Sequence, residues 1–324
     1  MKAAIYTSYG SPDVVRIADV EKPVPKDNEV LIKVRAASVN PLDWRLMKGE
    51  PRALRIMPRL LKMPIGHPGV DVAGEVEAVG RNVKQFKPGD AVFGACPAAI
   101  AEYACAREVG IAMKPDNFTF AQAASVNVAG LTALQGLRDK GKIQPGSKVL
   151  INGAAGGVGT FAVQIAKSFG AHVTGVCSTR NLEMVRSIGA DEVIDYTQND
   201  FTTGNQRYDL ILDCVGNHPF SACRRVLNPK GRFVMVGAPH DAKMRDLLAS
   251  MSEALVLSLF SNQKAVMFIA KSNQADLTFL GELITTGKMK PVIDKSYSLS
   301  EAAAAVRHVE EGHARGKVVI TLEY

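Results

Sequence analysis

The segment KVLINGAAGGVGTFAVQIAKSFGA, residues 148–171, constrains the fold of this chain more than any other part of the sequence. It begins with a short apolar run typical of a buried strand and continues through a turn rich in glycine. It ends in a stretch that places Phe161, Ile165 and Phe169 at helical spacing. A dinucleotide-binding unit requires this order of strand, glycine turn and helix. We therefore predict a strand at 148–153 and a helix that starts at the glycines.

Three glycines in this turn, Gly156, Gly157 and Gly159, have a direct chemical use. A residue without a side chain lets the backbone approach a pyrophosphate closely, and the N–H groups and dipole of the helix start favour its negative charge. We predict that these glycines, with Val158 between them, bind the pyrophosphate of a dinucleotide. The alternative is a tight turn that only packs the strand against the helix.

Apolar runs and amphipathic segments alternate from about residue 123 onward. Strands joined by helices form crossover units, and these build a parallel sheet that is covered on both faces. The sequence therefore predicts an α/β fold with a doubly wound Rossmann domain. After the strand at 148–153, further strands are predicted at 171–177, 191–196, 208–216, 232–238 and 264–271, with helices at 157–170, 181–190 and 220–231.

Residues 1–122 follow a different pattern, in which short strands are separated by turns such as KPGD at 87–90. We predict a mainly β first domain over 1–122 and a dinucleotide-binding domain over 123–265. The tail at 266–324 is expected to return to the first domain, which leaves the active site in the cleft between the two. A chain of 324 residues is long enough for two hydrophobic cores.

The end of the second predicted strand of the dinucleotide-binding domain indicates the type of cofactor. An NAD site normally presents Asp or Glu about 20 residues beyond the glycines, where the carboxylate binds the ribose 2′-hydroxyl. This sequence instead has Cys177, Ser178, Thr179 and Arg180. A hydroxyl and a guanidinium suit a 2′-phosphate, so we predict that Ser178 and Arg180 bind NADPH. The alternative for Arg180 is a solvated residue at the start of a helix.

Two further strand ends are predicted to lie at the same edge of the parallel sheet. Val215 and Gly216 follow one of these strands, and Gly237 follows the next. Ligands bind outside the carboxyl ends of the strands in open α/β sheets, so we expect these residues to lie against the nicotinamide. Both glycines fit equally well as simple turn residues.

The composition argues against several other classes of protein. Apolar residues make up 47% of the chain and charged residues 22%, as is ordinary for a globular protein. The five cysteines form no CxxC pair, and the net charge of +7 is spread without a dense basic run. We therefore expect no disulfide framework, no structural zinc lobe, no nucleic-acid partner and no membrane span. A cytoplasmic location is expected, and the apolar stretch 247–260 is predicted to be a buried helix.

Several motifs together resemble one enzyme superfamily. GVDVAGEVEAVG at 69–80, FKPGDAVFG at 86–94, the glycine turn and IGADEVIDY at 188–196 resemble the medium-chain dehydrogenase/reductase superfamily. AASVNPLDWR at 36–45 and GHARGKVVI at 312–320 are similar to its zinc-independent quinone oxidoreductase branch. The resemblance implies a GroES-like first domain and NADPH-dependent hydride transfer to quinones or to the C=C bond of α,β-unsaturated carbonyls. It also implies a small-molecule substrate and a homodimer.

The zinc ligands of this superfamily have no counterpart in the sequence. Asn40 stands where zinc-dependent members have Cys, and Val70 stands where they have the His of a GHE motif. His67 lies three residues before that position. Because a catalytic zinc needs three protein ligands at about 2.0–2.3 Å, we expect no metal site.

Asn40 and Asp43 are the candidate catalytic residues. The amide of Asn40 is suited to donate a hydrogen bond to cofactor or substrate, and Asp43 to hold the geometry of the cleft. The alternatives are an Asx turn ahead of Pro41 for Asn40 and a helix cap for Asp43.

The resemblance implies further contacts with the cofactor. The residues concerned are Asn127, Tyr196, Arg315 and Lys317. The alternative for the two basic residues is a pair of charges on a surface strand. A second function class stays open, in which the chain keeps the cofactor site but serves as a binding protein with little turnover.

Overall fold

The computed structural model describes residues 1–50, 66–239 and 244–322, without the side chains of Met244 and Leu247. The chain divides into two compact units. Unit 1 contains Met1–Val128, Lys271–Thr285 and Ile293–Tyr324, and unit 2 contains Ala129–Ala270 and Thr286–Val292. Unit 1 thus extends to Val128 rather than 122, and it also contains most of the C-terminal tail.

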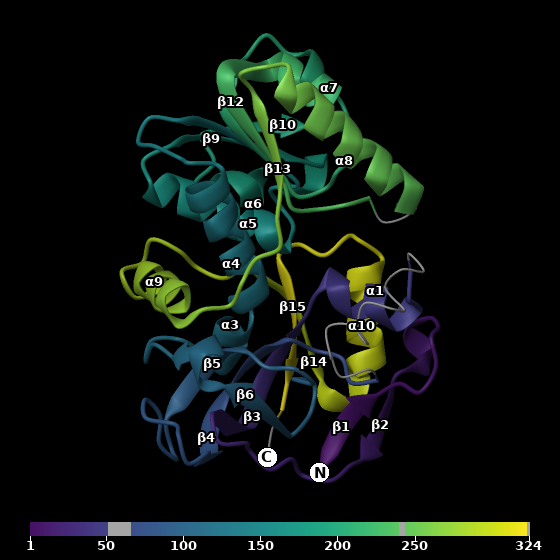
Figure 1. The fold of residues 1–324 in the computed structure, drawn as a ribbon, viewed down its shortest axis with the longest axis vertical. Coiled ribbons are helices and arrows are strands. Elements are labelled where there is room, and N and C mark those ends of the chain that lie inside the picture. The colour runs from purple at the N-terminus through teal and green to yellow at the C-terminus, as the bar shows by residue number, and fades with distance from the viewer. Residues whose placement is uncertain (51–65, 240–243, 323–324) are drawn as a thin grey trace. The chain divides into compact units, whose positions relative to one another are not determined.

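Unit 1 is built on a seven-stranded sheet centred on β3 (Glu29–Val39) (Figure 1). The strand order is β14-β15-β3-β4-β5-β7, and β6 also pairs with β3. β3 is buried along most of its length because β4, β6 and β15 all pair with it. The other strands of the sheet are β4 (Asp71–Val79), β5 (Ala91–Ala95), β6 (Tyr103–Arg107), β7 (Ile111–Met113), β14 (Ile293–Ser298) and β15 (Lys317–Thr321).

The remaining elements of unit 1 cover this sheet and close its core. Apolar side chains from several of these elements join those of the sheet in one cluster that includes Val30, Ile32, Trp44 and Ile320. The strands are β1 (Lys2–Ile5) and β2 (Arg16–Asp19), and the helices are α1 (Pro41–Lys48), α3 (Phe120–Ala124), α9 (Gln274–Thr285) and α10 (Ala302–Glu310). Short 3-10 turns occupy Pro12–Val14, Glu108–Gly110 and Leu299–Glu301.

Unit 2 contains a six-stranded sheet whose paired strands are all parallel. Its strands in chain order are β8 (Lys148–Asn152), β9 (His172–Cys177), β10 (Glu192–Asp195), β11 (Tyr208–Asp213), β12 (Leu227–Met235) and β13 (Lys264–Met267). They lie in the order β10-β9-β8-β11-β12-β13, so the order reverses between β8 and β11. This is the doubly wound arrangement, in which dinucleotides bind at the reversal point.

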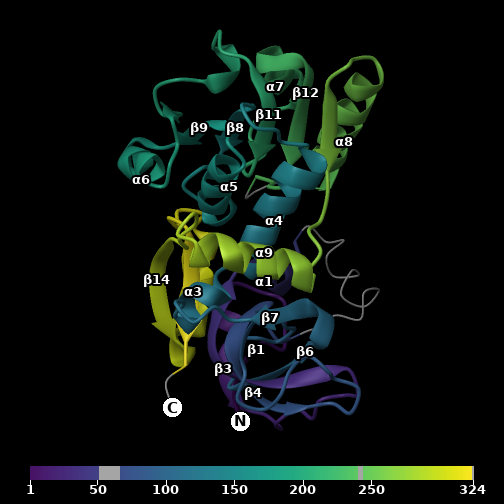
Figure 2. The same cartoon turned by 90° about the vertical axis from the view of Figure 1, so that its left-hand side faces the viewer.

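Helices cover both faces of this sheet, and Figure 2 shows α5 and α8 on two sides of its strands. Burial on both faces explains why Val149, Leu150 and Ile151 form a continuous apolar run instead of alternating with polar residues. The helices are α4 (Asn127–Gln135), α5 (Gly157–Ser168), α6 (Leu182–Ser187), α7 (Phe220–Cys223) and α8 (Met244–Leu259). A π-helical turn follows α4 at Gly136–Lys140, and 3-10 turns occupy Thr179–Asn181, Phe201–Thr203 and Arg224–Val226.

The apolar stretch at 247–260 forms α8, but the prediction that it is buried was wrong. Ala254 is buried, whereas Leu255, Val256, Leu259 and Phe260 are exposed. α8 packs on α7 and on β13, an edge strand, so only one face of the helix is covered. In the part of the chain that the structure describes, no helix combines the length and apolar character needed to cross a membrane.

Candidate active site

The glycine turn lies at the reversal point of the unit 2 sheet. β8 ends at Asn152, and Gly153 then turns the chain with a φ of +84°, a conformation that side chains disfavour. Gly156 is the N-cap of α5, which begins at Gly157. The first turn of a helix leaves its N–H groups without helical partners, so α5 presents donors for an anion at this point.

Two glycines of this turn have different steric surroundings. A Cβ on Gly159 would lie 2.1 Å from the carbonyl oxygen of Gly153, so only glycine lets α5 pack this close to the turn. A Cβ on Gly156 would meet the same oxygen at 3.4 Å, an ordinary contact. Packing therefore explains Gly159 but not Gly156. Gly156 is instead consistent with a surface that must remain open for a ligand, which fits the pyrophosphate of a dinucleotide.

A buried carboxylate joins the strands on either side of the reversal point. Asp213, the last residue of β11, accepts hydrogen bonds at Oδ1 from Asn152 Nδ2 at 2.9 Å, Val215 N at 3.0 Å and Gly216 N at 2.9 Å. Its Oδ2 is buried and has no hydrogen-bond partner among the described residues. Burial raises the pKa of Asp213 above its ordinary value. Asp213 therefore fixes the turn that carries the predicted Val215 and Gly216.

Glycine is required at two further positions near this turn. Gly216 has a φ of +75°. A Cβ on Gly237, which follows β12, would lie 2.0 Å from the carbonyl oxygen of Cys214. Packing and backbone conformation thus account for both residues, as the turn alternative proposes, and both lie at the strand ends where the sequence predicts the nicotinamide.

The residues predicted to recognise the 2′-phosphate follow β9. Ser178 is half-buried and accepts a hydrogen bond from Asn181 Nδ2 at 3.2 Å, while Arg180 is exposed. β10 pairs with β9, so its last residue, Asp195, lies beside the end of β9. Thr179 Oγ1 donates to Asp195 Oδ2 at 2.5 Å. Tyr196 is also exposed, and its backbone N–H donates to the carbonyl of Cys177 at 3.0 Å.

Asp195 was not predicted as a site residue. Its Oδ1 accepts the backbone N–H of Thr197 at 3.0 Å and the Thr197 hydroxyl at 2.8 Å. The hydrogen bonds from Thr179 and Thr197 hold the pKa of Asp195 below its ordinary value. The carboxylate is therefore held by local donors from both strand ends.

A second polar cluster lies inside unit 1 and is centred on Asp71, the first residue of β4. Asp71 is fully buried, and its Oδ2 accepts from Ser38 Oγ at 2.6 Å, Asn40 Nδ2 at 2.9 Å and Lys317 Nζ at 3.3 Å. Its Oδ1 accepts from Asn127 Nδ2 and from Val128 N, both at 2.9 Å. We call Asp71 and these five donor residues the Asp71 network.

The Asp71 network brings together three of the predicted site residues. Asn40, Asn127 and Lys317 lie far apart in the sequence, and each donates to the same carboxylate. Lys317 is buried and also donates to Asn40 Oδ1 at 2.6 Å, so its ammonium lies inside unit 1. Arg315, which was predicted to act with Lys317, is exposed.

Asp43 lies beside the Asp71 network in the first turn of α1. Its Oδ2 accepts the backbone N–H of Asn40 at 2.7 Å, as in a capping box, and its Oδ1 accepts the N–H of Gly69 at 2.9 Å. Asp43 therefore ties the start of α1 to the segment before β4. Burial raises the pKa of Asp43 to about 6, and the two N–H donors limit this rise.

His67 is half-buried in the segment before β4. Within the described ranges, no three His, Cys, Asp or Glu side chains gather in a way that could hold a metal ion. Asp71 directly follows Val70, the residue that stands where zinc-dependent members of the superfamily have a histidine ligand. The cationic partner of the Asp71 carboxylate is Lys317.

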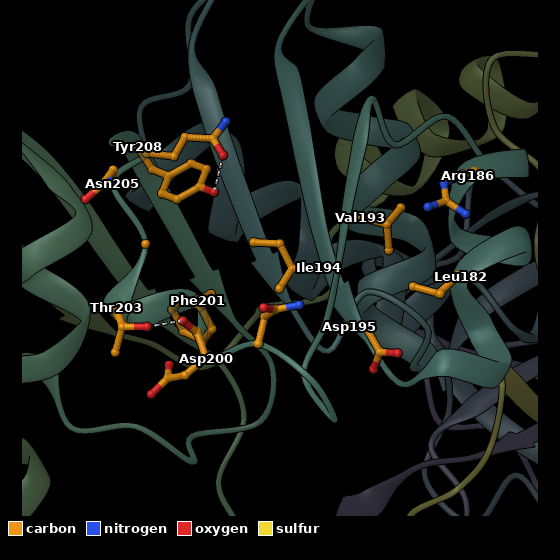
Figure 3. A pocket seen from close by; sticks show the side chains of 13 residues that line it. Leu182, Arg186, Val193, Ile194, Asp195, Asp200, Phe201, Thr203, Asn205 and Tyr208 are labelled. Carbon is orange, nitrogen blue, oxygen red and sulfur yellow. Dashed lines mark hydrogen bonds between the residues drawn. The ribbon is translucent and has the colours of Figure 1, made fainter.

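A pocket of about 440 Å³ lies elsewhere in unit 2, beside the edge strand β10 (Figure 3). α6 and β10 line one side, and the segment from Asp200 to Tyr208 lines the other. Two polar groups in its lining are satisfied locally: the Tyr208 hydroxyl donates to Gln206 Oε1 and Thr203 Oγ1 donates to the Asp200 carbonyl. None of the predicted site residues lines this pocket.

Asp71 and Asp213 are the main residues that the sequence-based prediction missed. Each is the single carboxylate of a short apolar stretch, GVDVAG for Asp71 and LILDCVG for Asp213. A carboxylate in such a run is buried only if donors surround it, so this pattern is a usable signal. The sequence does not show which donors those are.

Comparisons with known proteins agree with this architecture. Residues 26–136 match the family described as the alcohol dehydrogenase GroES-like domain, and residues 188–320 match the family described as zinc-binding dehydrogenase. The chain is 36% identical to the chloroplast envelope quinone oxidoreductase homolog of Arabidopsis thaliana, over 99% of this chain and 98% of the relative. The chain belongs to the medium-chain dehydrogenase/reductase superfamily. Within this superfamily it is an oxidoreductase of the quinone oxidoreductase-like branch.

Other members of the superfamily support this placement. The 2-methylene-furan-3-one reductase of Solanum lycopersicum is 35% identical, over 99% of this chain and 79% of the relative. The quinone oxidoreductase structure from Coxiella burnetii superposes with a TM-score of 0.89 at 32% identity, covering 100% of this chain and 99% of that one. A mycobacterial protein solved with NADPH has a TM-score of 0.82 at 26% identity, with 99% and 100% coverage. The predicted GroES-like domain and doubly wound Rossmann domain are confirmed.

Proposed function

We propose that this medium-chain oxidoreductase uses NADPH to reduce quinones or the C=C bond of α,β-unsaturated carbonyls. The observation that carries this proposal is the set of residues at the end of β9, beside the glycine turn. Ser178 and Arg180 stand where an NAD site has a carboxylate, and the nearby Asp195 is held by Thr179 and Thr197. The relatives named above as quinone oxidoreductases and a furanone reductase supply the substrate class.

Unit 2 has the groups that NADPH requires. Gly156, Gly157, Val158 and Gly159 would hold the pyrophosphate with backbone N–H groups, and Ser178 and Arg180 would hold the 2′-phosphate. Tyr196 is assigned to the adenosine half. Val215, Gly216 and Gly237 would lie along the nicotinamide, with Asp213 holding the turn in place. When bound, NADPH supplies a hydride from C4 of its nicotinamide.

Asn40 and Asp43, both in unit 1, remain the proposed catalytic residues. Asn40 donates one amide hydrogen to Asp71 and accepts from Lys317, and an amide has a second N–H that suits the oxygen of a quinone or enone. Asp43 would act by fixing the backbone of Asn40 and Gly69. Asn127, Arg315 and Lys317 remain proposed cofactor contacts. The buried state of Lys317 and the bonds of Asn127 to Asp71 favour an indirect role for these two.

We also propose that the reaction is independent of zinc. Asn40 stands where zinc-dependent members have a cysteine, and Asp71 directly follows Val70, which stands where they have a histidine. Both side chains accept hydrogen bonds from the Lys317 ammonium, which supplies a cation beside them. Without a Lewis acid, substrates that accept hydride readily at carbon are favoured over alcohols and simple aldehydes.

The proposed assembly is a homodimer, since exposed apolar side chains gather on α8 and β13. The cytoplasmic location stays a prediction.

The experiment that tests this function is loss of NADPH or NADH absorbance with a metal chelator present. The acceptors are 1,4-naphthoquinone, 9,10-phenanthrenequinone, an acrolein-type enone and a simple aldehyde, each with the wild type and Arg180→Glu. We expect chelator-resistant turnover of a quinone or enone. Arg180→Glu should raise the Kd for NADPH by about tenfold or more, because it loses charge-assisted hydrogen bonds, and should leave that for NADH nearly unchanged.

Two results would contradict the proposal in different ways. Equal weakening of both cofactors by Arg180→Glu would remove the 2′-phosphate role from this residue. Tight NADPH binding by the wild type without turnover of any acceptor would indicate the alternative, a cofactor-dependent binding protein.

A further inference from the structure

The chain leaves unit 1 after Val128 and returns to it at Lys271, and we call these two points the passages between the units. The Asp71 network includes the first passage, because Val128 is one of its members. α4 begins at Asn127, just before the first of these points. The helix start needs acceptors for its N–H groups, and the distant carboxylate of Asp71 supplies one by binding Val128 N at 2.9 Å. A residue of β4 therefore acts as the cap of the helix that leads into unit 2.

The second passage is joined to the first through the side chain of Asn127. Its Nδ2 donates to Asp71 at 2.9 Å, and its Oδ1 accepts from Ser272 Oγ at 2.8 Å. Ser272 follows the return point by one residue. The next residue, Asn273, accepts the N–H of Asp276 at 2.9 Å and so starts α9, which belongs to unit 1. Asn127 thus links both passages within unit 1.

The other oxygen of Asp71 is held by residues that take no part in these passages. Ser38 and Asn40 come from β3 and its C-terminal end, and Lys317 begins β15. A buried pair of Lys and Asp loses much of its Coulombic gain to desolvation, so stability alone is a poor reason for it. Such a fully bonded buried network is better suited to fixing one conformation.

We propose that Asp71 is a positioning residue that holds the two passages, at Asn127–Val128 and at Ser272, in one fixed arrangement within unit 1. It binds Val128 directly and Ser272 through Asn127, and it does not touch the reacting atoms. This inference rests on the proposed function only for its effect on turnover. Its effect on the two passages is independent of any substrate.

The test is hydrogen exchange of the full chain, measured without cofactor, for two matched variants. Ser272→Ala and Ser38→Ala each remove one serine hydroxyl bonded to the Asp71 network, but only Ser272 lies at a passage. In Ser272→Ala we expect the exchange rate at the start of α9, at Asp276 and Leu277, to rise about fivefold. This factor corresponds to losing the net stabilisation of one hydrogen bond. In Ser38→Ala exchange at these amides should stay at the wild-type rate.

Asp71→Asn extends the test to both passages. Exchange should rise at Val128 and at Asp276 together, while the amides of β8 and β11 in unit 2 keep their protection. With an acceptor that the wild type reduces, kcat should fall. The double variant Asp71→Asn, Lys317→Met removes the unpaired ammonium, so it should regain Tm but keep the raised exchange.

The outcomes separate this inference from the proposed function. Equal exchange in the two serine variants, or a uniform rise over all of unit 1 in Asp71→Asn, would overturn the positioning role. If Asp71→Asn does not fold, the serine pair alone decides the question. A wild type without turnover contradicts the proposed function and leaves the exchange measurement valid.

Discussion

Single buried carboxylates account for much of the polar structure inside this protein. Asp43, Asp71 and Asp213 are each buried and each accept backbone N–H groups, so each fixes a turn or a helix start. Their cost of desolvation is offset only where the donors are arranged around them. These three carboxylates therefore hold the backbone at Asn40, Val128 and Val215, each of which is a predicted site residue or directly follows one.

Asp43 makes the stability of the protein depend on pH in a defined direction. Burial raises its pKa from 3.8 to about 6, so the folded protein binds a proton at Asp43 more tightly than the unfolded chain. Its contribution to stability is therefore fully present below about pH 4 and is lost as pH rises through about 6. A difference of about two pKa units corresponds to ~3 kcal/mol.

The measurement is urea unfolding of wild type and Asp43→Asn between pH 4 and pH 7. We expect the stability of the wild type relative to the variant to fall by up to ~3 kcal/mol over this range, since Asn does not titrate. Titrating groups that do not interact with Asp43 cancel in the difference. A difference that is flat, or that rises with pH, would show that Asp43 keeps an ordinary or lowered pKa.

At the scale of elements, the strand, turn and helix at 148–168 follow directly from local sequence. The apolar run gives β8, the glycines give the turn, and the helical spacing gives α5. Helix α8 shows the limit of such patterns. Its apolar residues predicted burial, but its place over an edge strand leaves one face exposed.

The glycine turn allows packing and ligand binding to be separated by mutation. Gly159→Ala places a Cβ 2.1 Å from Gly153 O, so α5 must shift, at a cost of about 1–3 kcal/mol in unfolding free energy without cofactor. Gly156→Ala has room and a φ of −84°, so its stability should change by less than about 0.5 kcal/mol. We expect it instead to weaken NADPH binding.

Denaturant unfolding and NADPH fluorescence titration of both variants check this prediction. Gly156→Ala is the control for Gly159→Ala in the unfolding measurement, because both add the same methyl group. Unchanged NADPH affinity in a stable Gly156→Ala variant would mean that this part of the turn has no contact with the cofactor.

At the scale of the whole molecule, exposed apolar side chains are concentrated on one part of unit 2. They come from α8 and from the segment around β13, which pairs with β12 at the edge of the sheet. Exposed large apolar residues in this part are Leu248, Met251, Leu255, Val256, Leu259, Phe260, Met267 and Ile269. A patch of this kind beside an edge strand suits the isologous interface of a homodimer.

Native mass measured by light scattering tests the homodimer. For a chain of 34.7 kDa we expect about twice that mass, and Ile269→Lys should shift the protein toward the monomer. Val24→Lys is a matched control, because Val24 is 83% exposed and Ile269 is 87% exposed, but Val24 lies in unit 1. A monomeric wild type, or equal effects of the two variants, would count against this interface.

The sequence by itself determined the class of the fold and the glycine turn. Strand and helix periodicity, and the conformational freedom of glycine, act over a few neighbouring residues and can be recognised in a linear pattern. The family motifs added the GroES-like domain, and the comparisons confirmed it. The cofactor contacts proposed at Ser178 and Arg180 also come from local sequence.

Only the tertiary structure decided the partners of the buried polar groups. Asp71 and Lys317 are 246 residues apart, yet the pairing of β3 with both β4 and β15 brings them together. A carboxylate accepts from any suitably placed donor, so sequence shows that Asp71 needs partners but not which residues supply them. Hydrogen bonds depend on distance and direction in space, and the fold alone sets both.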